Sequence, residues 1–278
     1  MPLFLLAGVC FSTLDATAKW LVRDHTLFLV VWARYLGQMV VVTPIAWHRA
    51  GPSFWRTAHL KVQLARSVCL IVATACFFGA LRFLPLAEAS AITFLAPMFA
   101  IVLSMPVLGE RPTRARWIAA VIGFAGILIL VRPGGAAFHP AAALLVVAAL
   151  ANALYQLLTR KLPKDSPYTT LFYSALVGTA VLSLALPTAE LPSEFTTRDA
   201  IFLLVLGALA GLGHFLLTGA FLAAPASLVA PFTYLQMIWA TLYGYFIFSQ
   251  LPDGFSLLGM AVIIASGVWL FWRERRMR

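Results

Sequence analysis

The amino-acid sequence predicts an all-α membrane protein whose ten transmembrane helices form a 5+5 inverted repeat. Three observations lead to this prediction: the composition, the number of long apolar runs and a weak internal repeat. Of 278 residues, 62% are hydrophobic and only 11% are charged, and the mean hydropathy is +0.92. A soluble domain is usually about 45–50% apolar and about 25% charged. The composition therefore excludes an ordinary soluble protein.

Ten apolar runs are long enough to cross a bilayer, which requires about 20 residues each. Pro, Gly and charged residues break the chain after runs two, four, five, six, seven and nine, in "RAGPSFW", "GERPTRA", "RPGGAAFHP", "LPKDSP", "PTAELPSE" and "QLPDG". Single Pro and Gly residues inside a run are tolerated in membrane helices, so each run is predicted as one helix. The runs lie at residues 2–22, 27–47, 60–81, 86–108, 115–131, 141–159, 168–188, 199–222, 227–249 and 255–272.

The distribution of Lys and Arg predicts that both termini are cytoplasmic. With that orientation, fourteen basic residues fall on cytoplasmic segments and four on the outside, as the positive-inside rule requires. The first group is Arg49, Arg56, Lys61, Arg66, Arg111, Arg114, Arg116, Arg160, Lys161, Lys164, Arg273, Arg275, Arg276 and Arg278; the second is Arg23, Arg82, Arg132 and Arg198. The net charge of +10 is thereby explained without a nucleic-acid partner. We expect a multi-pass protein of the plasma (inner) membrane.

The internal repeat appears when the chain is aligned with itself so that Gly79 falls on Gly219. In the same register, Ala80 matches Ala220, Pro85 matches Pro225, Thr93 matches Thr233, Leu95 matches Leu235, Ala100 matches Ala240 and Pro112 matches Pro252. We predict a first five-helix repeat over residues 1–136 and a second over 137–278. Because five is odd, the second repeat enters the membrane upside down. Inverted repeats are the recurring plan of secondary transporters, in which two halves rock about a site near the middle of the membrane.

The segment "LRFLPLAEASAITFLAPMFAIVLSMPVLGERPTRARWIAAVIGFAGILIL" resembles the EamA family of the drug/metabolite transporter superfamily. The resemblance rests on the small residues before Pro97, on "LGE" at Leu108–Glu110 and on the glycine-spaced fifth helix. It implies a ten-helix carrier with a central cavity lined mainly by helices 1–4 and 6–9, and with helices 5 and 10 at the periphery. Among the branches of the family, the chain is most similar to the YddG-type amino-acid exporters.

Three charged residues stand inside the first two apolar runs. Asp15 and Lys19 share one face of the first helix, and Arg34 in the antiparallel second helix lies at a similar depth to Asp15. Since charges in the membrane are expensive, they should face the bundle interior and find partners. We predict an Asp15–Arg34 ion pair, with Lys19 nearer the outer mouth. The pair either locks the two helices together or lines a vestibule that contacts a substrate carboxylate.

His214 lies in a glycine-rich helix, and it is either a satisfied buried histidine or a cavity residue with a role in coupling. Aromatic and neutral polar residues also converge from both repeats at mid-depth. The residues of this kind are Tyr35, Phe77, Asn152, Gln156 and Gln236, together with the candidate cavity residues Trp32, Phe78, Phe94, Tyr155, Tyr234 and Trp239. Such a pocket suits small zwitterions or aromatic solutes, and it has too few fixed charges for a nucleotide sugar.

These features predict an alternating-access carrier that exports amino acids or similar small metabolites. A multidrug or sugar carrier of the same fold is the alternative. An intramembrane enzyme is not expected, because the five histidines are scattered and no nucleophile–base pair is visible. A channel is disfavoured because no charged ring or filter segment is present. We expect no cofactor or metal, the lipid bilayer and a small molecule as partners, and a monomer or weak homodimer.

Overall fold

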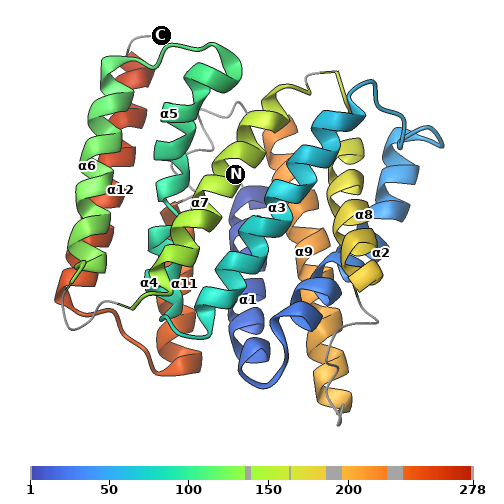
Figure 1. The fold of residues 1–278 in the computed structure, drawn as a ribbon, viewed down its shortest axis with the longest axis horizontal. Coiled ribbons are helices and arrows are strands. Elements are labelled where there is room, and N and C mark those ends of the chain that lie inside the picture. Colours follow the sequence, from blue (N-terminus) through green and yellow to red (C-terminus); the bar gives the residue numbers. More distant parts are fainter. Residues whose placement is uncertain (1, 135–138, 163, 186–195, 224–233, 277–278) are drawn as a thin grey trace.

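A computed structural model describes residues 2–134, 139–162, 164–185, 196–223 and 234–276 of the chain, and all regular structure within these ranges is helical (Figure 1). The helices are α1 (Pro2–Asp24), α2 (Leu27–Ala50), α3 (Leu60–Leu81), α4 (Leu86–Ile92), α5 (Leu95–Leu108), α6 (Arg114–Val131), α7 (Ala142–Arg160), α8 (Pro167–Ala185), α9 (Thr197–Ala223), α11 (Leu235–Phe248) and α12 (Gly254–Arg276).

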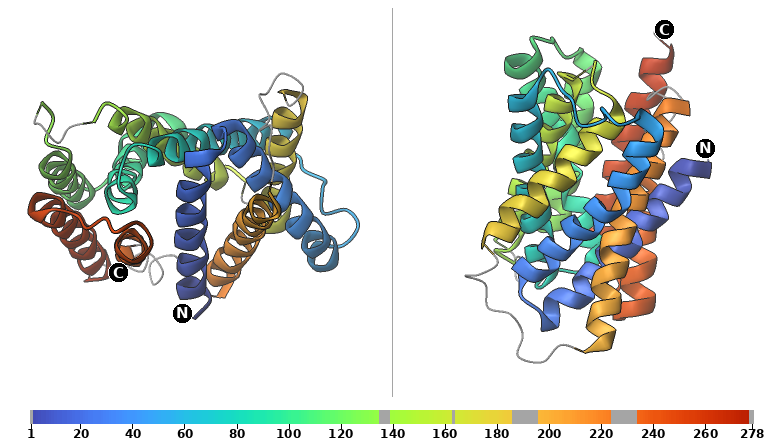
Figure 2. Two further views of the ribbon diagram at one scale, coloured as in Figure 1. Left: turned by 90° about the horizontal axis from the view of Figure 1, so that it is seen from below. Right: turned by 90° about the vertical axis from the view of Figure 1, so that its right-hand side faces the viewer.

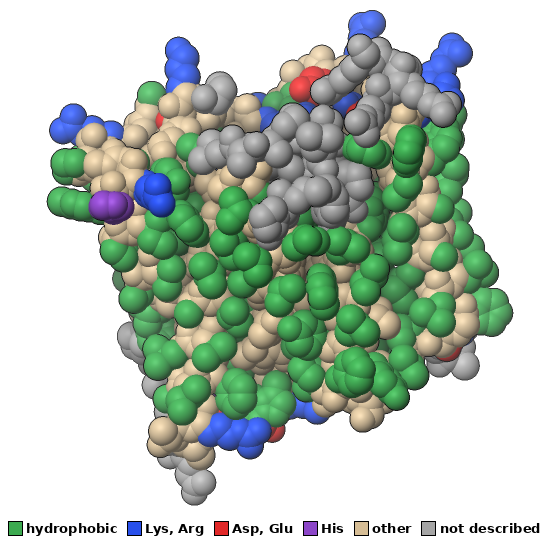
Figure 3. All heavy atoms as spheres, turned by 180° about the vertical axis from the view of Figure 1, so that it is seen from behind, with side chains coloured by type: hydrophobic (Ala, Val, Ile, Leu, Met, Phe, Trp, Pro, Cys, Tyr) green, Lys and Arg blue, Asp and Glu red, His purple; other side chains and the backbone are tan. Residues whose placement is uncertain are grey.

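The predicted all-α membrane fold is confirmed. Over the described ranges, nine helical segments are long and apolar enough to cross a bilayer, and α11 is a shorter apolar helix. The predicted runs agree with the helices to within a few residues, except that residues 186–188 and 227–233 lie outside the described ranges. Figure 3 shows hydrophobic side chains over the middle of one face, with Lys and Arg gathered toward its two ends. This distribution is the one expected of a protein surrounded by lipid.

The fourth predicted helix is not continuous, and this corrects the sequence-based prediction. α4 ends at Ile92 and α5 begins at Leu95, with a turn at Thr93 and Phe94 between them. The physical reason is Pro97, which has no N–H for the carbonyl of Thr93, four residues earlier, and whose ring clashes with that carbonyl in a regular helix. The Thr93 carbonyl instead accepts a hydrogen bond of 3.0 Å from the Ala96 N–H.

The internal repeat is visible in the helix boundaries. The alignment that pairs Gly79 with Gly219 also places α5 on α11 over their whole lengths, and it places the first residue of α6 on the first residue of α12. Gly109 and Ser249, which follow α5 and α11, both adopt the left-handed conformation. The α5–α6 loop and the α11–α12 loop lie at opposite ends of the bundle (Figure 1), as inversion requires. The predicted boundary between residues 136 and 137 lies outside the described ranges and stays a prediction.

The two halves interdigitate. α1 packs against α9 and α11, α2 packs against α8 and α9, and α3 packs against α7 and α8. α6 and α12 pack against each other and form one edge of the molecule (Figures 1 and 2), which is the peripheral position that the family resemblance implies for helices 5 and 10. The centre of the bundle is therefore an interface between elements of the first and second halves.

Glycines allow α2 and α9 to cross at very short range. A Cβ atom built on Gly37 of α2 would lie 2.5 Å from the Cα of Gly207 in α9, and one built on Gly207 would lie 3.0 Å from the Ala33 carbonyl oxygen. Small residues permit this close approach of backbones in membrane bundles. Gly219, on the same helix, is different, since the one described atom near its added Cβ is Leu3 Cδ1, at an ordinary 3.6 Å.

We therefore expect Gly207→Ala to destabilise the bundle by about 1–3 kcal/mol through overpacking, whereas Gly219→Ala should be nearly neutral. Thermal unfolding of the detergent-solubilised protein, followed by size-exclusion chromatography, measures both. Equal melting temperatures for the two variants would contradict the close α2–α9 crossing.

Candidate functional site

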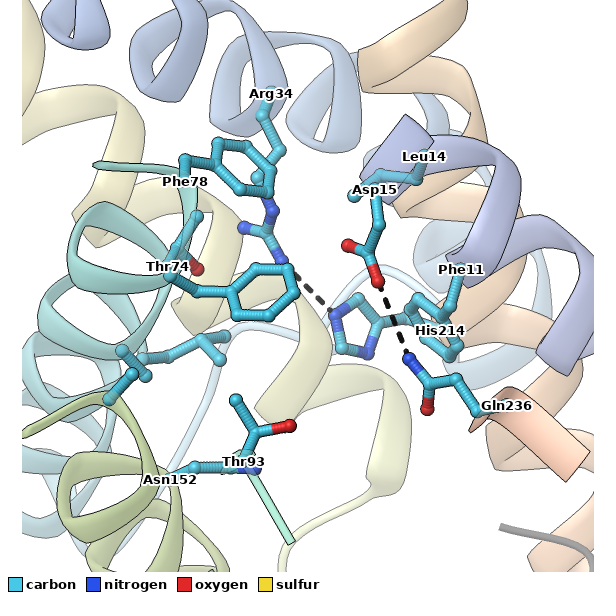
Figure 4. A pocket seen from close by; sticks show the side chains of 14 residues that line it. Phe11, Leu14, Asp15, Arg34, Thr74, Phe78, Thr93, Asn152, His214 and Gln236 are labelled. Atoms are coloured by element: carbon cyan, nitrogen blue, oxygen red, sulfur yellow. Dashed lines mark hydrogen bonds between the residues drawn. The ribbon is translucent and has the colours of Figure 1, made fainter. Parts of the chain in front are cut away.

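A cavity of about 210 Å³ lies at the interface of the two halves (Figure 4). Its walls come from α1, α2, α3, α7, α9 and α11 and from the turn between α4 and α5. The lining residues are Phe11, Leu14, Asp15, Arg34, Leu70, Ala73, Thr74, Phe77, Phe78, Thr93, Ala148, Asn152, His214 and Gln236. Half of these residues are apolar or aromatic and half are polar or charged. Polar groups placed in a concave site are what fixes the orientation of a small molecule.

The two charged residues of this lining do not form the predicted ion pair. Among the described residues, the structure has no Asp15–Arg34 contact within 4.0 Å. Asp15 Oδ2 instead accepts a hydrogen bond of 3.4 Å from Gln236 Nε2, and Arg34 Nη2 lies 3.4 Å from His214 Nε2. The reason is that α1 packs along α11, which carries Gln236, while α2 packs along α9, which carries His214, so each side chain meets the second half of the protein. The prediction of a direct pair is wrong, although both groups face one cavity.

Arg34 is an incompletely satisfied cation. Its side chain is 5% exposed, and within the described part of the chain its buried Nη1 atom has no hydrogen-bond partner. A buried guanidinium without a carboxylate is unfavourable, and it therefore favours the entry of an anionic group into the cavity.

His214 is positioned to orient this guanidinium. Arginine can only donate hydrogen bonds, so the Arg34–His214 contact requires that Nε2 is unprotonated and accepts. The imidazole also packs edge-on against Phe11, with ring centroids 5.0 Å apart. His214 is thus a half-buried residue that lines the cavity, and a role in coupling stays a prediction.

Lys19 does not line the cavity. Its ammonium donates hydrogen bonds to the backbone carbonyls of Leu81 (2.9 Å) and Leu84 (2.5 Å), and the residue is 2% exposed. These carbonyls lie at the C-terminal end of α3, where a cation is favourable. We assign Lys19 a structural role that fastens α1 to the α3–α4 turn.

Of the six aromatic residues predicted to line the cavity, one does so in the structure. Phe78 lines the cavity, but Phe94, Tyr234, Trp32, Tyr155 and Trp239 are not part of its wall. Phe94 and Tyr234, which occupy equivalent positions in the two repeats, stack on each other with centroids 5.1 Å apart. Trp32 Nε1 donates a hydrogen bond to Ser183 Oγ at 2.9 Å. Tyr155 accepts a hydrogen bond from Arg66, and Trp239 lies beside Gly8.

Arg66, which was expected on a cytoplasmic segment, is buried in α3 and only 2% exposed. Each of its three nitrogen atoms donates to neutral acceptors from α7 and α8. Nε donates to Thr159 Oγ1 (2.6 Å), Nη1 donates to the Thr170 carbonyl (2.9 Å) and Ser174 Oγ (2.8 Å), and Nη2 donates to Tyr155 Oη (2.8 Å). The position of Arg66 inside the predicted apolar run at residues 60–81 was a signal of burial, but its partners lie far away along the chain and could not be named.

Several cavity residues were not among the predicted candidates. They include Phe11, Thr74 and Thr93. Phe77, Asn152 and Gln236, which the sequence did indicate at mid-depth, also line the cavity, whereas Gln156, indicated in the same way, is exposed and not part of the wall. Thr93 could not be recognised because its exposure to the cavity depends on the break between α4 and α5. Polar residues at mid-depth were the better signal, since aromatic residues are also common in ordinary packing.

A cavity enclosed by two inverted halves, in a bundle of membrane-spanning helices, defines a transporter of the secondary type. The model of the EamA-like transporter family matches the chain twice, at residues 1–132 and 139–272. The chain belongs to the EamA-like transporter family, and it is a multi-pass membrane transporter and not an enzyme.

Relatives of known role extend over nearly the whole chain. An S-adenosylmethionine uptake transporter of Rickettsia felis is 30% identical over 98% of this chain and 92% of its own length. A riboflavin transporter of Vibrio cholerae is 29% identical over 99% of this chain and 93% of its own length. A pseudopaline exporter of Pseudomonas aeruginosa is 27% identical over 96% of this chain and 94% of its own length. A solved crystal structure is similar with a TM-score of 0.72 at 21% identity, covering 99% of this chain and 97% of that chain, which supports the fold.

The hydrogen bonds of Arg66 yield a prediction about stability. Arg66→Lys keeps the charge but cannot reach the four acceptors at once, because an ammonium lacks the planar fork of a guanidinium. Unsatisfied buried groups cost about 1–3 kcal/mol, so the melting temperature of the purified protein should fall clearly. The matched control is Arg114→Lys, because Arg114 is exposed and begins α6. This variant should have the melting temperature of the wild-type protein. A melting temperature unaffected by Arg66→Lys would contradict the buried network.

Proposed function

We propose that this secondary transporter carries small zwitterionic metabolites of the amino-acid class. The observation that carries the proposal is the pair of opposite charges, Asp15 and Arg34, which face one cavity without contacting each other. A zwitterion supplies the missing partner for both: its carboxylate meets the Arg34 guanidinium and its ammonium meets the Asp15 carboxylate. Charge-assisted hydrogen bonds of this kind are among the strongest available to a ligand.

The size of the cavity supports the same class. Its volume is about 210 Å³. Sites for drug-sized ligands are larger, at about 300–1,000 Å³. In this conformation the cavity therefore favours a molecule the size of an amino acid.

A second candidate is a larger metabolite such as S-adenosylmethionine. It is favoured by the relatives, since the protein 30% identical to this chain over 98% of its residues is named for uptake of that compound. S-Adenosylmethionine also has an amino-acid head group that the same two charges could bind, but it requires a wider cavity. A sugar or multidrug carrier of the same fold has less support, because an opposed Asp15–Arg34 pair serves neither substrate class.

We further propose export across the inner membrane by a monomer or weak homodimer with both termini in the cytoplasm. The support for the orientation is the excess of Lys and Arg on one set of loops. The relatives are named for uptake in one case and export in another, so the direction of net transport rests on the family branch inferred from sequence.

The test of substrate class is exchange in proteoliposomes. Vesicles loaded with unlabelled compound should accumulate labelled neutral amino acids with saturable kinetics, with and without an imposed pH gradient. The panel includes S-adenosylmethionine and riboflavin. Exchange of S-adenosylmethionine alone would replace the proposal with the second candidate, and exchange of neither amino acids nor S-adenosylmethionine by folded protein would overturn both.

The two charged residues make a sharper prediction with three ligands of almost equal size. Alanine has both charges, alaninamide lacks the carboxylate, and lactate lacks the ammonium. In competition with labelled alanine, Arg34→Met should weaken alanine and lactate by roughly 10- to 100-fold but leave alaninamide unchanged, since it removes only the partner of the carboxylate. Asp15→Asn should weaken alanine and alaninamide and spare lactate.

Arg49→Met is the matched control, because Arg49 is exposed near the end of the same helix α2. It should leave all three inhibition constants unchanged. If Arg34→Met weakens alanine and alaninamide equally, the guanidinium does not bind the carboxylate.

A further inference from the structure

The cavity has a second polar region, formed by Asn152 of α7 and Thr93 in the turn between α4 and α5. Both side chains line the cavity. Figure 4 shows them together on the side of the cavity opposite Arg34, with His214 between the two regions. The rings of Phe77 and Phe78 form part of the remaining wall. A ligand whose head group binds Arg34 and Asp15 would therefore direct its distal group toward Asn152 and Thr93.

The Asn152 amide is available to a ligand. It makes no hydrogen bond to another residue within the described ranges, and its side chain is only partly buried. Its NH₂ group can donate and its carbonyl oxygen can accept.

The Thr93 hydroxyl has a more restricted capacity. It donates its single hydrogen to the Ser90 carbonyl oxygen at 2.6 Å. What it offers to the cavity is therefore an acceptor. The hydrogen bond to Ser90 is local to the break between α4 and α5, so the orientation of this acceptor is fixed by the backbone.

Together, the region offers the NH₂ group of Asn152 as a donor and the oxygen atoms of Asn152 and Thr93 as acceptors. It carries no charge. A distal carboxylate can only accept, so it would leave both acceptors without a partner. A distal ammonium can only donate, so it would leave the Asn152 NH₂ group without a partner. Asp15 and Arg34 are the charged residues among the described cavity lining, and the head group uses both. A neutral group that both donates and accepts, such as a primary amide, satisfies every atom.

We propose that Asn152 and Thr93 form a side-chain subsite that selects amino acids with a neutral, amide-like distal group over aliphatic, acidic and basic ones. This inference rests on the proposed function, because it assumes that the zwitterionic head group binds Arg34 and Asp15. The subsite acts on specificity and not on the head group, so alanine binds independently of it.

The experiment compares asparagine with leucine, which have nearly the same shape, as competitors of labelled alanine in proteoliposomes. Wild-type protein should bind asparagine at least about tenfold more tightly than leucine, because leucine leaves the polar groups of the subsite unpaired. Asn152→Leu, an equally isosteric change in the protein, should abolish or reverse this ratio, with each inhibition constant expressed relative to that of alanine in the same variant. The four inhibition constants form a double-mutant cycle between protein and ligand.

Gln156→Leu is the matched control, since it replaces an exposed amide one turn away on the same helix that does not line the cavity. It should preserve the wild-type ratio. Thr93→Val provides a second test if Asn152→Leu does not fold, and it should weaken asparagine several-fold without affecting leucine.

The subsite is overturned if wild-type protein binds asparagine and leucine equally tightly. It is also overturned if the preference for asparagine remains in both Asn152→Leu and Thr93→Val. In either case, uptake of alanine by the wild-type protein would still support the proposed function. Tighter binding of aspartate or lysine than of asparagine would overturn it in the same way. Absence of amino-acid uptake by folded wild-type protein would instead overturn the proposed function, and the subsite with it.

Discussion

The absence of water at membrane depth is the constraint on which the rest of this structure depends. Each charged or polar group inside the bilayer must find its partner within the protein. Lys19 does so through the carbonyls at the end of α3, and Arg66 does so through four neutral acceptors of α7 and α8. Arg34 does not, since its Nη1 atom is buried without a partner in the described part of the chain. Among the described residues that line the cavity, Arg34 is the one with a buried polar atom left without a partner, and this is the physical reason for proposing the cavity as a ligand site.

The same constraint explains why the cavity lies between the halves. α9 packs along both α1 and α2, with a glycine contact so close that side chains cannot intervene. Since α11 also packs along α1, the side chains of Asp15 and Arg34 meet Gln236 of α11 and His214 of α9, which belong to the second half. A ligand that binds the two charges consequently contacts both halves of the repeat. A rocking movement of one half against the other would change these contacts, which is what an alternating-access carrier needs.

The candidate site was only partly predictable. Asp15, Arg34, Phe78 and His214 could be named in advance because charged residues and mid-depth polar residues are rare in membrane helices. Most aromatic candidates were wrong as cavity residues, because aromatic rings serve packing as often as binding, and Phe94 and Tyr234 satisfy each other by stacking. Thr93 became a cavity residue through the helix break that Pro97 causes, and the tolerance of membrane helices for proline concealed that break in the sequence.

The sequence by itself determined the class of the protein. Hydrophobic composition, the length of the apolar runs and the internal repeat are local or periodic properties, and lipid leaves helices as the only way for such runs to satisfy their backbone. Which partner each buried group takes was decided by the tertiary structure alone. Asp15 and Arg34 lie at a similar depth, which suggested a direct pair. Depth alone does not specify how α1 and α2 are rotated about their axes, or that α9 packs against both of them. Those were fixed by the packing of α9, through glycines such as Gly37 and Gly207 whose significance depends on residues in the opposite half of the chain.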